Sequence, residues 1–118
     1  MKSSLPRYLS ALAIVLSCLP QVLLAAPPRI TLQPTNQTVA LGDTAIFAVA
    51  AGGMTPLYYQ WMHGGTNLTG RTNTVLTITN VQLPDAGVYS VVVSNRSGST
   101  TSSNAVLTVL TSPPGISL

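Results

Sequence analysis

Apolar and polar residues alternate over short stretches along most of the chain after residue 27. Leu76 and Ile78, for example, alternate with Thr77 and Thr79, which places the apolar pair on one face of a half-buried β-strand. The same pattern predicts strands at 29–33, 37–40, 44–51, 57–62, 76–79, 88–93 and 104–110, and a short one at 66–69. No stretch after residue 27 shows helical periodicity, so the pattern predicts an all-β protein.

Turn-forming residues separate these predicted strands at short intervals. Gly42-Asp43, Gly52-Gly53, Gly64-Gly65 and Arg96-Ser97-Gly98 each lie between two of the strands. Short strands with turn signals roughly every eight to twelve residues are typical of a sandwich of two antiparallel β-sheets. We therefore expect an all-β sandwich of about seven to eight short strands.

The stretch from residue 76 to 95 is predicted to organise this sandwich. It consists of one strand, a corner formed around Pro84, and a second, largely apolar strand. Trp61, the only tryptophan, is expected at the centre of the core. The residues expected to support the fold, in the core or at the corner, are Phe47, Val49, Trp61, Leu76, Ile78, Asp85, Gly87, Tyr89 and Val91.

The first 26 residues differ in character from the rest of the chain. Lys2 and Arg7 precede an apolar run at 9–16, and the small residues Ala25-Ala26 follow. This order predicts a secretory signal peptide over residues 1–26. The alternative is an uncleaved membrane anchor, but serines and a proline interrupt a run that would need about 20 apolar residues to span a bilayer.

The sequence allows more than one cleavage site and more than one type of signal in this segment. Pro27 is a poor residue to follow a cut, so cleavage after Ala25 competes with cleavage after Ala26. A lipoprotein signal ending at Cys18 is a further alternative, which the apolar stretch after that cysteine disfavours. The remaining chain is interpreted as one domain at 27–111 and a tail at 112–118.

Removal of the predicted signal changes the charge and the cysteine content. The full chain has five Lys and Arg against two Asp and Glu. Three arginines and two aspartates remain afterwards, which is a net charge of about +1 and leaves no lysine. Nucleic-acid binding needs clustered basic residues, so that class is excluded. The only cysteine, Cys18, lies in the signal, so no disulfide is expected although secretion would permit one.

One short segment occurs twice. Pro27-Pro28-Arg29-Ile30-Thr31-Leu32 is echoed by Pro113-Pro114-Gly115-Ile116-Ser117-Leu118. The spacing is about the length of one sandwich domain, so residues 112–118 are interpreted as a linker or as the start of a further repeat. Chance similarity within a tail rich in proline and serine is the alternative.

The residues from 28 to 110 resemble an immunoglobulin-like domain of the intermediate set. The motifs that carry this resemblance are Leu41-Gly42-Asp43, Gln60-Trp61, Leu76-Thr77-Ile78-x-Asn80-Val81, Asp85-x-Gly87-x-Tyr89, and Ser94-Asn95 with Gly98. The family's paired cysteines would fall at Val49 and Val91. The resemblance therefore implies a cysteine-free version, of the kind repeated in secreted and surface proteins of bacteria. There such units act as spacers, as adhesion units, or as domains appended to polysaccharide-acting enzymes.

Residues capable of catalysis or metal binding are scarce. After the signal the chain has one histidine, His63, and two aspartates, Asp43 and Asp85. Asp85 is expected to hydrogen-bond backbone amides or to pair with an arginine, and His63 is expected to be an exposed loop residue. Zinc would need a fuller ligand set and calcium a cluster of acidic oxygens. We therefore expect no enzyme activity, no metal and no cofactor.

Binding is the remaining class of function. Tyr58 is the one aromatic residue expected on an outer sheet face, and it is the candidate ligand contact. The sequence predicts a secreted or cell-surface module that acts as a structural spacer or as an adhesion or protein-interaction unit in a tandem array. The alternative is a carbohydrate-binding accessory module. Under either function, the partner of the protein is expected to be a protein or polysaccharide at the cell surface, and the chain is expected to contact a membrane only during export.

Overall fold

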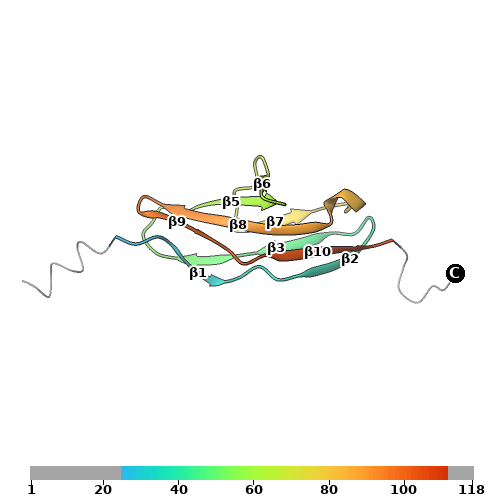
Figure 1. Ribbon diagram of the computed structural model, residues 1–118, viewed down its shortest axis with the longest axis horizontal. Helices are drawn as coiled ribbons and strands as arrows, with labels where there is room; N and C mark the ends of the chain where they lie inside the picture. Colours follow the sequence, from blue (N-terminus) through green and yellow to red (C-terminus); the bar gives the residue numbers. More distant parts are fainter. Residues whose placement is uncertain (1–24, 112–118) are drawn as a thin grey trace, which may run out of the picture.

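A computed structural model describes residues 25–111 of the chain (Figure 1). Most of the predicted signal segment and the whole predicted tail at 112–118 lie outside these residues. The described part is all-β apart from one short 3-10 helix, η1 (Leu83–Asp85). Its strands form two facing layers with the apolar side chains between them.

The first layer contains four short strands that pair two by two. β1 runs antiparallel to β4, and β3 runs antiparallel to β7. Their bounds are β1 Arg29–Leu32, β3 Ala45–Ala48, β4 Ala50–Gly52 and β7 Val75–Ile78. One continuous strand was predicted at 44–51, but the chain changes partner from β7 to β1 at Val49. The Val49 amide donates to the carbonyl of Thr74 at 2.9 Å, which extends the pairing with the β7 side.

The second layer is a six-stranded sheet. Its order is β2, β10, β8, β5 and β6, and β9 also pairs with β8. The bounds are β2 Gln37–Ala40, β5 Tyr58–His63, β6 Thr66–Asn67, β8 Gly87–Asn95, β9 Gly98–Thr101 and β10 Ala105–Leu110. β8 is the longest strand, at nine residues, and it forms the centre of this layer.

Two features of the second layer differ from the predicted arrangement. β2 pairs parallel to β10, while every other strand pair is antiparallel. β1 ends at Leu32 in the first layer, and Pro34 lies in the link to β2. The chain continues through this link to the edge of the second layer without reversing, which makes the new pair parallel. β9 was not predicted, because Gly98-Ser99-Thr100-Thr101 offers no apolar alternation.

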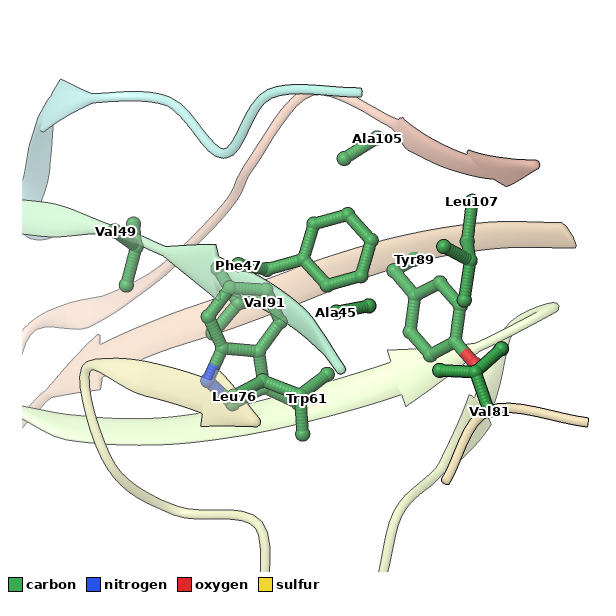
Figure 2. Close-up of a cluster of buried hydrophobic side chains, with 10 residues drawn as sticks. All are labelled: Ala45, Phe47, Val49, Trp61, Leu76, Val81, Tyr89, Val91, Ala105 and Leu107. Atoms are coloured by element: carbon green, nitrogen blue, oxygen red, sulfur yellow. The ribbon is translucent and has the colours of Figure 1, made fainter. Parts of the chain in front are cut away.

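The core lies between the layers and is centred on three aromatic rings (Figure 2). The ring of Phe47 is 6.4 Å from that of Trp61 and 5.0 Å from that of Tyr89. Trp61 is fully buried, and its indole N–H donates to the carbonyl of Asn73 at 2.8 Å. The other buried members are Ala45, Val49, Leu76, Val81, Val91, Ala105 and Leu107, with Ile78 packed against them half-buried.

The predicted fold class is therefore confirmed. The described residues form a two-layer β-sandwich, and they contain no cysteine, so no disulfide joins the layers. Residues 25–111 contain ten strands, more than predicted, because one predicted strand is divided at Val49 and because β9 is a strand.

Candidate functional site

The corner before β8 is built around the side chain of Tyr89. The ring is buried, and the hydroxyl donates to the carbonyl of Asp85 at 2.6 Å. The Asp85 carboxylate in turn accepts from the amide of Gln82 at 2.8 Å, which closes the turn of η1. Asp85 thus takes the first of its two expected roles, that of bonding a backbone amide. Burial, together with the charge of Asp85, raises the pKa of Tyr89 to about 12.

His63 completes this corner, and the expectation of an exposed loop histidine was wrong. β5 extends to His63, which pairs with Tyr89 across the sheet, and the two rings stack at 4.4 Å with 2° between their planes. The ring nitrogen Nε2 lies 3.0 Å from the carbonyl of Ala86. Since Trp61 faces inward and side chains alternate along a strand, His63 lies on the core side.

Gly87 is the position at which this corner leaves no room for a side chain. Its φ is +134°, and a Cβ there would lie 3.0 Å from Nε2 of His63. A side chain at Gly87 would therefore strain the backbone and push against the imidazole. The sequence pattern singles out Asp85, Gly87 and Tyr89. It misses His63, whose only signal is that it follows Tyr59 and Trp61 at period two.

The three polar side chains of the corner are each occupied by backbone groups. The Tyr89 hydroxyl and a His63 ring nitrogen bond carbonyls, and the Asp85 carboxylate bonds an amide. Within residues 25–111 there is no pocket and no group of three His, Cys, Asp or Glu residues able to hold a metal ion. The geometry therefore gives the corner a structural role: it fixes the start of β8.

Tyr58 stands apart from the core on the outer face of the second layer. Its side chain is 62 % exposed, at the start of β5. The residue opposite it on β8 is Ser94, which in turn is opposite Ser99 on β9. The other tyrosine of the strand, Tyr59, packs against the core. Tyr58 is thus a single aromatic ring in a row of serines.

A second polar cluster holds the N-terminal segment against the loops at one end of the sandwich. We call this end the N-terminal pole; it comprises Ala26–Pro28, the loop at Gly53-Met54 and the β8–β9 hairpin Asn95–Gly98. The side-chain NH₂ group of Asn95 donates to the backbone carbonyls of Ala26 at 3.1 Å and Met54 at 3.3 Å.

Close packing adds to these hydrogen bonds. Pro28 is buried and accepts a hydrogen bond from the hydroxyl of Thr100. A Cβ on Gly98 would lie 3.2 Å from the ring of Pro27, and one on Gly53 would lie 3.4 Å from the Cα of Pro28. The Pro-Pro pair is therefore part of the folded domain.

The immunoglobulin domain family matches residues 27–95, which is more than half of the chain. This chain belongs to the immunoglobulin domain family. The immunoglobulin domain described here has the family's fold and contains no cysteine within residues 25–111.

Individual relatives come from proteins of different kinds. Endoglucanase C of Cellulomonas fimi is 34% identical over 91 residues, which is 74% of this chain. Roundabout homolog 2 of Homo sapiens is 36% identical over 104 residues, which is 81% of this chain. The chain spans only 8% of the length of each of these proteins.

Solved structures give the same fold. A structure of three immunoglobulin domains of titin matches with a TM-score of 0.66 and 27% sequence identity. The match covers 71% of this chain and 32% of the titin chain, which corresponds to about one of its three domains. No helix among the described residues is long and apolar enough to cross a membrane.

Proposed function

We propose that this chain is exported and supplies a non-catalytic immunoglobulin unit of a tandem array, acting as a structural spacer or as an adhesion or protein-interaction unit. The observation that carries the proposal is the repeated Pro-Pro segment. In the domain, Pro28 is buried and Ile30 packs against the core. Pro113-Pro114 and Ile116 repeat these residues at the same spacing, so they have the sequence needed to begin a second domain.

The placement of polar groups supports a non-catalytic role. Each titratable side chain of the Tyr89 corner bonds a backbone group, and no pocket lies beside them within residues 25–111. The similarity to a titin structure of three immunoglobulin domains supports the array, because one unit of that chain corresponds to this one. The predicted signal peptide supports export and a secreted or cell-surface location.

A second candidate is a carbohydrate-binding accessory module. The similarity to endoglucanase C favours it, and Tyr58 supplies an exposed ring of the kind that stacks on sugars. Against it stands the isolation of that ring, since the residues opposite it across the sheet are serines. The spacer or interaction unit is therefore the better-supported function.

Export is tested by mass spectrometry of the protein recovered outside the producing cell. We expect a mature N-terminus at Ala26 or Pro27, because the small residues there follow the apolar run. Intact Met1 recovered in the membrane fraction would contradict export as a cleaved protein.

Sequencing the native gene downstream of codon 118 tests the array. We expect further domains of this kind, and an adjoining glycosidase domain would favour the second candidate.

Sugar binding is tested by affinity electrophoresis of the mature chain through gels that contain soluble β-glucans. We expect no retardation of the native protein. Retardation that is lost in Tyr58→Ala and kept in Thr77→Ala, a matched change on the outer face of the first layer, would overturn the spacer proposal in favour of the accessory module.

A further inference from the structure

The formal charges of the domain are separated along its long axis. The end opposite the N-terminal pole is here called the C-terminal pole; it comprises the turn Leu41–Asp43 and η1 (Figure 1). It holds both aspartates, Asp43 and Asp85. Arg96 belongs to the N-terminal pole, and Arg29 follows Pro28 directly at the start of β1, opposite Gly52. The eight steps along β8 separate the two ends by about 27 Å.

The third arginine belongs to neither pole. The carbonyl of Arg71 accepts from the amide of Trp61 at 3.0 Å, in the middle of β5. Among residues 25–111 the N-terminal pole is therefore positive and the C-terminal pole is negative. One further positive charge, that of Arg71, lies midway between the two poles, at the waist of the domain. This arrangement is complementary to itself when two copies are placed end to end.

Exposed apolar side chains occur at both poles as well. Leu41 is 45 % exposed and Leu83 is 56 % exposed, and both lie at the C-terminal pole. Met54 at the N-terminal pole is 39 % exposed, and Pro27 beside it is also exposed. Burying apolar side chains against each other stabilises a contact. Each pole thus has exposed apolar side chains next to charged ones, and the charge of one pole is opposite in sign to that of the other.

The length of the connection forces these two poles together in a tandem chain. The amide of Leu41 donates to the carbonyl of Leu110 at 2.9 Å, so the chain leaves β10 at the C-terminal pole. Only Thr111 and Ser112 separate Leu110 from Pro113-Pro114. Two residues span at most roughly 10 Å between the flanking Cα atoms, and the Pro-Pro pair of the first copy is itself part of its N-terminal pole.

We propose that the C-terminal pole is a docking surface for the N-terminal pole of a second copy of this domain placed after it. The inference rests on the tandem array of the proposed function and adds to it the surface, the partner and the forces. Asp43 and Asp85 face Arg96 of the second copy, and Leu41 and Leu83 pack against its Met54 and Pro27. The partner charge is that of Arg96, because Gly115 stands at the position of Arg29 in the repeated segment. The two copies then move as one body.

The test is a chain in which residues 26–112 are followed by residues 27–111 of a second copy. Residues 25–111 contain a complete core, so each half folds by itself. The rotational correlation time is measured by ¹⁵N relaxation at about 20 mM and about 500 mM salt, because exposed charge pairs are screened at high salt. We expect a correlation time about twofold longer than that of the single domain at low salt, and a shorter one at high salt.

Charge reversal makes the test specific for the poles. Asp43 is suited to it because its side chain is exposed while its backbone amide and carbonyl hold the turn through Ala40 and Val81. Asp43→Arg in the first copy should shorten the correlation time toward that of the single domain. Adding Arg96→Asp in the second copy should restore it. Arg71→Asp in the first copy changes the charge by the same magnitude with the opposite sign, at a site away from both poles, and should have no effect.

The proposal is overturned if native and Asp43→Arg tandem chains have equal correlation times at both salt concentrations, or if Arg71→Asp acts as strongly as Asp43→Arg. This outcome is distinguishable from failure of the proposed function. A native gene with no further domain would remove the array, whereas the tandem chain reports only on whether the poles dock.

Discussion

Tyr89 joins β8 to the turn that precedes it through one buried hydroxyl group. The hydroxyl donates to the carbonyl of Asp85, and the ring is held between Phe47 and His63. Tyr89→Phe removes the hydrogen bond while keeping the ring, so we expect the free energy of unfolding to fall by about 1 kcal/mol. Urea denaturation measures this change, and an unaltered midpoint would argue against the corner as the anchor of β8.

The raised pKa of Tyr89 gives the domain a stability that depends on alkaline pH. The pKa is about 12 in the folded protein, above about 10 for an unperturbed tyrosine in the unfolded chain. Folding therefore favours the neutral phenol, so the contribution is complete below pH 10 and is lost as the pH rises toward 12. Thermal melts across this window should show a decline that is smaller in Tyr89→Phe; parallel declines in both proteins would refute the assignment.

Trp61 is the largest fully buried side chain among residues 25–111. It is fully buried between the layers and also donates to the carbonyl of Asn73. Trp61→Ala should lower the free energy of unfolding by roughly 3–5 kcal/mol, out of a total of about 5–10 kcal/mol for a domain of this size. Circular dichroism should show a largely unfolded variant. The control is Tyr58→Ala, an exposed site, which should stay within about 0.5 kcal/mol of the native protein.

Ser102 lies between the end of β9 and the start of β10, where its side chain takes the place of a backbone acceptor for β8. Ser102 is buried; its hydroxyl oxygen accepts from the amide of Val91 at 2.9 Å, and its own amide donates to the carbonyl of Val91 at 2.8 Å. This side chain lets the chain pass from β9 to β10 without leaving a buried amide of β8 unpaired.

Ser102→Ala should therefore be costly for so small a change. It leaves the buried amide of Val91 without an acceptor, and we expect the free energy of unfolding to fall by about 1–3 kcal/mol. Ser99→Ala, an exposed serine on the neighbouring strand, is the matched control and should have almost no effect. Equal denaturation midpoints for the two variants would show that Ser102 does not carry the crossing.

The elements that could be predicted are those with apolar residues at every second position. Leu76 with Ile78, and Ala105 with Leu107, have one buried face, and that face is visible in the sequence. β9 could not be found this way, because its pairing with β8 uses backbone groups while its side chains are small and polar. His63 was misplaced for a different reason: two glycines follow it, and they mark the turn without showing that the strand reaches it.

The corner was predictable in part, since Asp85, Gly87 and Tyr89 form a recognisable spacing. What the sequence could not supply was the set of backbone partners, because a hydrogen bond to a carbonyl leaves no mark in side-chain chemistry. The parallel pairing of β2 with β10 belongs to the same category. It depends on the direction that the chain takes in the link around Pro34. The alternation of apolar residues within a strand shows which face is buried and does not show which strand lies beside it.

The molecule as a whole is held by its core and not by a covalent staple. Val49 and Val91 occupy the positions at which the family resemblance implies cysteines. Both are buried, Val49 between β3 and β4 of the first layer and Val91 in β8 of the second, and both belong to the core cluster that contains Trp61 (Figure 2). The account therefore requires that these two valines face each other across the sandwich.

The double variant Val49→Cys/Val91→Cys tests this requirement most directly. A cross-link there would enclose about 42 residues and remove on the order of 4 kcal/mol of unfolded-chain freedom. The loss of two valine side chains and any strain cost roughly 1–3 kcal/mol together. The measurement is thiol titration of the native protein without residues 1–26, and therefore without Cys18, followed by thermal melts with and without reductant. We predict no free thiol after oxidation, a Tm above that of the parent, and a Tm below it once reduced. Two thiols that stay free and accessible in the native protein would contradict the account.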